Sequence, residues 1–224
     1  MRRRKTLSEL RYLTMPPAHL AHQWSKDFSV QLLDKVWKGY DLLRKEILTE
    51  IDVSEAEDDL ERNITELLEK RIRSVMDGGE PFYIQHNSTE RETRKTAPAQ
   101  PPQYDLAFVF HANERLKWPL EAKILKGTKK GDIASYISDV KNEFLTCRYA
   151  PFSCEGAMLG YLLSGKAPNI FSLIEVEVPC VLTVHPDFLK RHHKTSDHQR
   201  IIPAGKENEY PSEFRCHHLV LQIK

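Results

Sequence analysis

Two charged residues, Glu121 and Lys123, stand two positions apart near the end of the apolar segment WPLEAKILKG (residues 118–127). In a β-strand their side chains point to the same face and that of Ala122 points to the other, because strand side chains alternate. A third charge, Asp105, lies at the start of another apolar segment, YDLAFVF (104–110). The short stretch HANER between the two segments favours an antiparallel hairpin, which brings Asp105 beside Glu121.

Two carboxylates and an ammonium at one end of a sheet are suited to metal-assisted hydrolysis of phosphodiesters. Asp105 and Glu121 supply the hard oxygen ligands that Mg²⁺ prefers, and the carbonyl of Ala122 is a further candidate ligand. A bound Mg²⁺ polarises a phosphodiester and lowers the pKa of a water ligand. Lys123 can orient or help to deprotonate that water, or it can neutralise charge that develops on the phosphate.

The pattern is specific to this place in the chain. Glu121 is the only glutamate that is followed two positions later by a lysine. A comparable pair, Asp139 and Lys141, lies in a segment predicted to be helical, where residues i and i+2 point about 200° apart and do not converge on one ion. The structural alternative is a surface salt bridge between Glu121 and Lys123, with Asp105 capping a turn.

The elements around these residues follow from periodicity. Apolar residues recur at helical spacing over residues 17–49, 54–77 and 131–145, with a short helix and extended chain predicted over 167–178. Strands are predicted over residues 81–86, 104–110, 116–125, 155–165, 180–185 and 214–223. Pro119 inside the third of these predicts a bulge or an edge-like position. This order of elements predicts an α/β sandwich with a mixed sheet.

The segments PPQYDLAFVF and WPLEAK, together with a helix before and a helix after them, resemble the core of the PD-(D/E)XK nuclease superfamily. The resemblance covers roughly residues 54 to 165 and implies a restriction-endonuclease-like fold, in which a mixed sheet is flanked by helices. It assigns the family's Asp to Asp105, its Glu to Glu121 and its Lys to Lys123. We therefore divide the chain into an N-terminal helical extension (1–53) and a nuclease-like domain (54–224). Tyr104 stands where the family often has proline.

Many members of that family carry a further acidic residue on the first core helix, directed at the metal. The candidates here are Glu57, Glu61 and Glu66. Glu57 is predicted to form a capping box with Ser54. Glu61 is in register with the apolar stripe of Ile64, Leu68 and Ile72, whereas Glu66 lies farther from it. Glu61 is therefore the favoured fourth site residue.

Composition limits the ways in which the chain can bind nucleic acid. Its net charge is only +1, whereas proteins that bind nucleic acid by bulk electrostatics are usually far more basic. Four basic residues near the predicted site are candidate phosphate contacts, with solvated side chains as the alternative: Lys126, Lys129, Lys130 and Arg148. The N-terminal MRRRKTLSELRYL has no apolar signal region, and no apolar run approaches the roughly 18 residues of a membrane span, so a cytoplasmic protein without a membrane partner is expected.

Histidines and cysteines gather late in the chain. A zinc site that combines Cys216 with these histidines is conceivable, although the spacing matches no standard zinc pattern. The alternative is a polar loop at KRHHKTSDHQR, with one buried and one exposed residue in the pair His217 and His218, because neighbouring strand residues point to opposite faces. Cys147, Cys154, Cys180 and Cys216 include no C-x-x-C pair and are expected to be thiols.

Three hypotheses follow. The first is an Mg²⁺-dependent endonuclease, with Mn²⁺ as a substitute, that hydrolyses phosphodiester bonds, with DNA the favoured substrate. The second is a non-catalytic module on the same fold that binds nucleic acid or a protein. The third, compatible with the first, is a nuclease effector held inactive by a larger partner protein, as in bacterial anti-phage or restriction systems; restriction-like enzymes also act as homodimers. The third rests on fold-level analogy.

Overall fold

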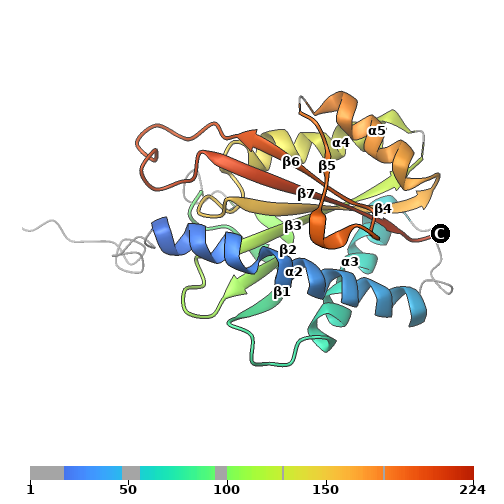
Figure 1. Ribbon diagram of the computed structural model, residues 1–224, viewed down its shortest axis with the longest axis horizontal. Coiled ribbons are helices and arrows are strands. Elements are labelled where there is room, and N and C mark those ends of the chain that lie inside the picture. The colour runs from blue at the N-terminus through green and yellow to red at the C-terminus, as the bar shows by residue number, and fades with distance from the viewer. Residues whose placement is uncertain (1–17, 47–55, 94–99, 128, 179) are drawn as a thin grey trace, which may run out of the picture.

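The strands that carry Asp105 and Glu121 lie next to each other in a seven-stranded mixed sheet (Figure 1). The computed structural model describes residues 18–46, 56–93, 100–127, 129–178 and 180–224. The strand order is β1-β2-β3-β4-β7-β6-β5. The strands are β1 (Phe82–Thr89), β2 (Gln103–Phe110), β3 (Lys117–Lys126), β4 (Glu155–Ser164), β5 (Thr183–Val184), β6 (His193–Gln199) and β7 (Glu213–Gln222).

The predicted hairpin is confirmed. β2 and β3 pair antiparallel from Val109 opposite Lys117 to Leu106 opposite Leu120. β3 then pairs in parallel with β4, and β4 with β7, while the remaining neighbours are antiparallel. β3 is therefore a central strand. It follows β2 and precedes α4 in the chain, so both of these elements can bring side chains close to it.

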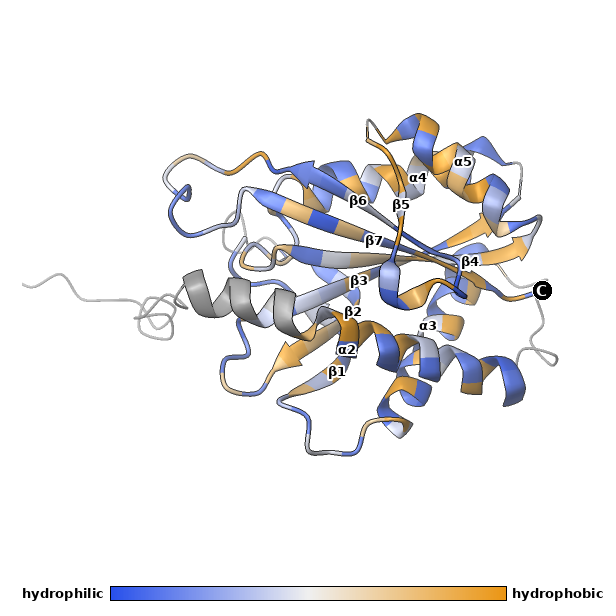
Figure 2. Ribbon diagram, viewed as in Figure 1, coloured by the Kyte–Doolittle hydropathy of each residue, from blue (hydrophilic) through white to orange (hydrophobic). Residues whose placement is uncertain are grey.

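Helices cover both faces of the sheet (Figure 1). The helices α2 (Ala18–Glu46) and α3 (Glu57–Ser74) pack on one face, in a core that includes Leu60, Trp118 and Leu159. The helices α4 (Lys130–Asp139) and α5 (Ala167–Glu177), with a π-helix (Val140–Phe144) that follows α4, pack on the other face. These helices carry hydrophobic and hydrophilic residues in alternating patches, as expected for helices with one buried face (Figure 2).

Several predicted elements differ from the structure. β6 (His193–Gln199) lies in the segment predicted to be a polar loop, and it pairs with β7 along its whole length. α5 extends through most of the segment predicted to be partly extended, while β5 contains only Thr183–Val184. Of the two alternatives predicted for Pro119, the edge-like position is the one found: Pro119 pairs with Ala107 of β2, and the pairing of β3 with β4 begins only at Leu120.

None of the described helices is both long and apolar enough to span a membrane. The predicted boundary between residues 53 and 54 falls in a segment outside the described residues. α2 shares its core with α3 and the sheet: Leu32, Val36 and Trp37 are buried together with Ile64 and Leu68.

Candidate functional site

Beyond the last β2–β3 pair, carboxylates accept the backbone N–H groups of β3 on the side that faces β2. The antiparallel pairing ends at Leu106 and Leu120, so the next backbone N–H groups on that side of β3 have no strand partner. Asp105 Oδ2 accepts the N–H of Ala122 at 2.7 Å, and Glu61 Oε2 accepts the N–H of Ile124 at 2.9 Å. Exposed strand edges need such partners, and here two of the four predicted site residues supply them.

Lys123 lies at the centre of this acidic cluster. Its Nζ is 3.4 Å from Glu121 Oε1 and 3.6 Å from Glu61 Oε1. The helix α3 contributes Glu61, β2 contributes Asp105, and β3 contributes Glu121 and Lys123. The structure therefore brings together the four side chains that sequence reasoning selected: Glu61, Asp105, Glu121 and Lys123.

A fifth residue, Asp139, joins the cluster, and it was missed by the sequence analysis. Asp139 Oδ2 lies 3.1 Å from Lys123 Nζ, closer than either glutamate. Asp139 was not selected from the sequence, because Asp139 and Lys141 on one helix point about 200° apart and do not converge on one ion. Its actual partner is on the sheet beneath α4. One signal could have pointed to it: Asp139 lies next to Val140 and three residues after Tyr136 on the apolar side of the helix.

Burial makes these carboxylates hard to ionise. Burial raises the pKa of Glu121 well above its usual value of 4.5, and the nearby charge of Asp105 raises it further. Burial also raises the pKa of Asp105, and it raises the pKa of Glu61 to about 7 against the opposing effect of Lys123. Burial opposes the charge of Lys123 as well, but Glu121, Glu61 and Asp139 together keep its pKa above 10.5. The site thus gathers carboxyl groups that resist ionisation around one ammonium that stays charged.

The donor set fits a divalent cation in one specific respect. Glu121 Oε2 is buried and has no hydrogen-bond partner, which leaves a carboxylate oxygen that a hard cation would satisfy. Asp105 and Glu61 each use one oxygen for β3 and have a second oxygen for a ligand. Within the described part of the chain, however, no three His, Cys, Asp or Glu side chains are arranged as a metal-binding group. The carboxylates converge on Lys123 Nζ, and Ala122 contacts Asp105 through its N–H.

The basic residues predicted to contact nucleic acid are mostly paired with acidic ones. Lys126 and Lys129 form ion pairs with Glu57, at the first turn of α3, and Arg148 pairs with Glu143 at 2.5 Å. Lys130 is exposed at the start of α4.

The predicted capping box is wrong for Glu57. The N-cap of α3 is Ala56, without a side-chain cap, and the carboxylate of Glu57 binds the two lysines instead. Ser54, the predicted partner of Glu57, lies outside the described residues.

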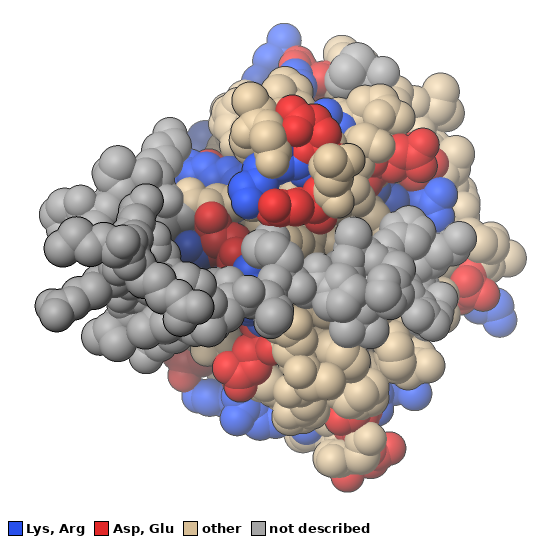
Figure 3. All heavy atoms as spheres, turned by 90° about the vertical axis from the view of Figure 1, so that its left-hand side faces the viewer, with Lys and Arg blue, Asp and Glu red and all other residues tan. Residues whose placement is uncertain are grey.

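Charges of both signs are interspersed on the described surface at the end of the molecule shown in Figure 3. A single-sign basic field, which would attract nucleic acid from a distance, is not a feature of the atoms described on that face. This agrees with the formal net charge of +1.

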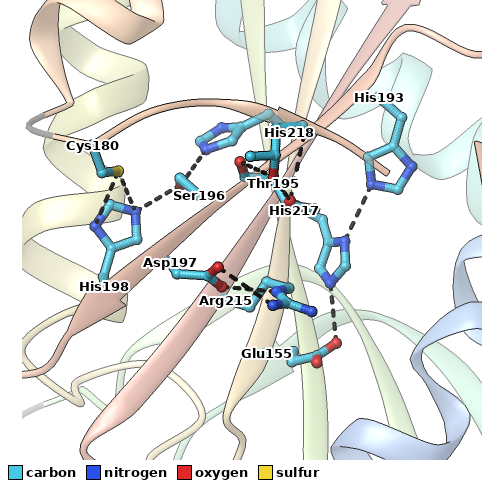
Figure 4. Close-up of polar contacts among 11 residues, drawn as sticks. Glu155, Cys180, His193, Thr195, Ser196, Asp197, His198, Arg215, His217 and His218 are labelled. Carbon is cyan, nitrogen blue, oxygen red and sulfur yellow. Dashed lines mark hydrogen bonds and ion pairs between the residues drawn. The ribbon is translucent and has the colours of Figure 1, made fainter. Parts of the chain in front are cut away.

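The late histidines form hydrogen-bonded chains on the two faces of β7 (Figure 4). On one face, His217 joins His193 at 3.2 Å and Glu155 at 3.0 Å. On the other face, His218 bonds to Ser196 at 2.7 Å and to Tyr136 at 3.0 Å.

The prediction of opposite faces for His217 and His218 is confirmed, but both side chains are buried, so the expectation of one exposed histidine is wrong. Cys180 Sγ is 3.8 Å from His198 Nε2, while Cys216 is fully buried. No zinc-like group of three side chains forms among these described residues.

Comparisons of the chain with protein-family models, with curated proteins and with solved structures give no match.

Proposed function

We propose that this chain is a metal-dependent nuclease on a restriction-endonuclease-like fold. One observation carries the proposal: three separate elements bring the carboxylates of Glu61, Asp105 and Glu121 around Lys123, and Glu121 keeps a buried oxygen without a hydrogen bond. The arrangement of β2 and β3, with an acidic residue on the first and Glu-x-Lys on the second, supports the same assignment.

Stability alone does not account for this cluster. Crowding buried carboxylates raises their pKa values and destabilises the fold at neutral pH, and Lys123 compensates for only part of the negative charge. Titratable groups perturbed in this way concentrate at functional sites, where their charges act on a substrate or an ion.

In the proposed reaction, Glu61, Asp105 and Glu121 would hold Mg²⁺ or Mn²⁺. When bound, such an ion polarises a phosphodiester and lowers the pKa of a water ligand. Asp105 and Glu61 are fixed in place by their hydrogen bonds to the β3 backbone, so these carboxylates would be oriented before an ion binds. Lys123 places a positive charge beside the reacting phosphate, where it orients the water or offsets developing charge.

DNA is the favoured substrate, and a second protein or a second copy of the chain is the favoured partner. The near-neutral net charge supports a role for such a partner in bringing the site to nucleic acid. An effector of an anti-phage or restriction system fits this description by analogy.

Nicking of supercoiled plasmid tests the proposal. The wild type should nick DNA with Mg²⁺ and not with EDTA. Lys123→Ala and Glu121→Ala should each lower the rate by about 10²-fold or more. Glu66→Ala is the matched control, because Glu66 is an exposed carboxylate on α3 that pairs with Lys70. A folded wild type that cuts neither DNA nor RNA with Mg²⁺ or Mn²⁺, or a fully active Lys123→Ala variant, would overturn the assignment.

A further inference from the structure

Asp139 makes the shortest contact with the lysine of the site. The distance from Asp139 Oδ2 to Lys123 Nζ is 3.1 Å, against 3.4 Å for Glu121 and 3.6 Å for Glu61. Asp139 Oδ2 is buried and accepts no well-aligned hydrogen bond from the described residues. The polar contact recorded for this oxygen is its ion pair with Lys123.

A change in helix type holds Asp139 over the sheet. Asp139 is the last residue of α4, and the next turn is a π-helix, in which the N–H of Leu145 bonds to the carbonyl of Val140 at 3.0 Å. Tyr136 and Val140 anchor the helix in the core on either side of Asp139. Such π-turns insert a residue into a helix and often occur at functional sites.

The other three carboxylates, Glu61, Asp105 and Glu121, have different roles from that of Asp139. Glu61 and Asp105 are tied to backbone N–H groups of β3, and in the proposed function both of them, together with Glu121, turn their remaining oxygens to a divalent cation. A divalent cation held by these carboxylates would compete with Lys123 for them and would repel its ammonium. Lys123 then requires a carboxylate partner that does not bind the ion. Asp139, which lies on α4, is close enough to be that partner.

We propose that Asp139 is a positioning residue for Lys123: it holds the ammonium in the site while Glu61, Asp105 and Glu121 engage the divalent cation. The inference rests on the proposed function for its catalytic meaning, but the contact itself is independent of catalysis. The rival assignment, in which Asp139 is itself a ligand of the cation, has a different experimental signature.

Nuclear magnetic resonance of the Lys123 ammonium tests the contact without any substrate. Protein is labelled with ¹⁵N at lysine Nζ, the Lys123 signal is assigned with Lys123→Arg, and the exchange of its protons with water is measured. Asp139→Asn, which keeps the size of the side chain, should speed that exchange about threefold or more, because the ammonium loses its nearest ion-pair partner. Glu66→Gln is the control and should leave it unchanged, because Glu66 pairs with Lys70.

Metal binding and cleavage complete the test. Asp139→Asn should bind Mn²⁺ with a Kd within about threefold of wild type, and it should lower kcat about tenfold or more with little change in KM. Asp139→Glu should recover part of the rate. A loss of Mn²⁺ affinity beyond about tenfold would make Asp139 a ligand and overturn the positioning role.

The two proposals fail in distinguishable ways. Exchange in Asp139→Asn equal to wild type would overturn the contact, and normal cleavage by this variant would overturn its catalytic meaning. If the wild type cleaves nothing while the exchange depends on Asp139, the nuclease function is refuted and the contact of Asp139 with Lys123 is supported.

Discussion

Replacing Glu61 with glutamine should stabilise the folded protein at neutral and alkaline pH. Burial is the chief cause that raises the pKa of Glu61 from 4.5 to about 7, so the folded state disfavours the ionised form of this side chain. A carboxyl with a raised pKa contributes stability that is fully present below pH 4.5 and is lost as pH rises through 7. Glutamine imitates the neutral form, and its carbonyl can still accept the N–H of Ile124.

The size of the effect follows from the same pKa change. The difference between 4.5 and about 7 corresponds to about 3 kcal/mol of unfolding free energy at pH 8. The Glu61 side chain is only 22% exposed, so solvent screening removes little of this. The pKa of about 7 already includes the opposing effect of Lys123, so the loss of that contact in the variant is part of the same figure.

Urea unfolding at several pH values, with EDTA present, measures this difference. The variant Glu61→Gln should be about 2–3 kcal/mol more stable than wild type at pH 8 and equal to it near pH 4.5. Glu66→Gln, an exposed carboxylate on the same helix, is the control and should show no such pH dependence. A Glu61→Gln variant that is less stable than wild type at pH 8 would refute the conclusion that the ionised Glu61 destabilises the folded protein.

Three further outcomes test the surrounding fold. Arg200→Met should cost about 3 kcal/mol in urea unfolding, because the buried guanidinium donates to the carbonyls of Phe144 and Ser153 among others. Arg62→Met, at an exposed arginine, should cost almost nothing. Burial lowers the pKa of His218 from 6.5 to about 3 and so keeps it neutral. Between pH 7 and pH 5, wild type should therefore lose about 2 kcal/mol of unfolding free energy relative to His218→Gln. An equal change in stability of the two proteins would contradict this. Gly39→Ala should lower the Tm despite the higher helix propensity of alanine, because its Cβ would lie 2.7 Å from Ile72 Cγ1 where α2 crosses α3.

The local parts of the site were predictable from sequence. Asp105, Glu121 and Lys123 lie on two strands joined by a short connection, so alternation and the hairpin were enough to place them together. Glu61 was predictable from its phase on the apolar stripe of α3, since one face of that helix must pack on the sheet.

Non-local contacts account for what was missed. The helical phase of Asp139 places it on the buried side of its helix, but its contact with Lys123 depends on the path of α4 over β3, which periodicity within the helix does not give. β6 lacks apolar alternation, and its inward side chains, His193 and Thr195, are buried because polar partners on other strands and helices satisfy them. Glu57 is drawn to Lys126 and Lys129, which are distant in sequence, instead of capping its own helix.

Titration calorimetry with Mn²⁺ tests whether Asp105 and Glu121 belong to a metal site. Wild type should bind the ion, and Asp105→Asn and Glu121→Gln should each weaken binding at least about tenfold. Glu155→Gln, which changes a buried carboxylate outside the site, should bind as wild type does. Wild-type protein that does not bind Mn²⁺, or Glu121→Gln protein that binds it equally well, would contradict the assignment of this cluster as a metal-dependent nuclease site.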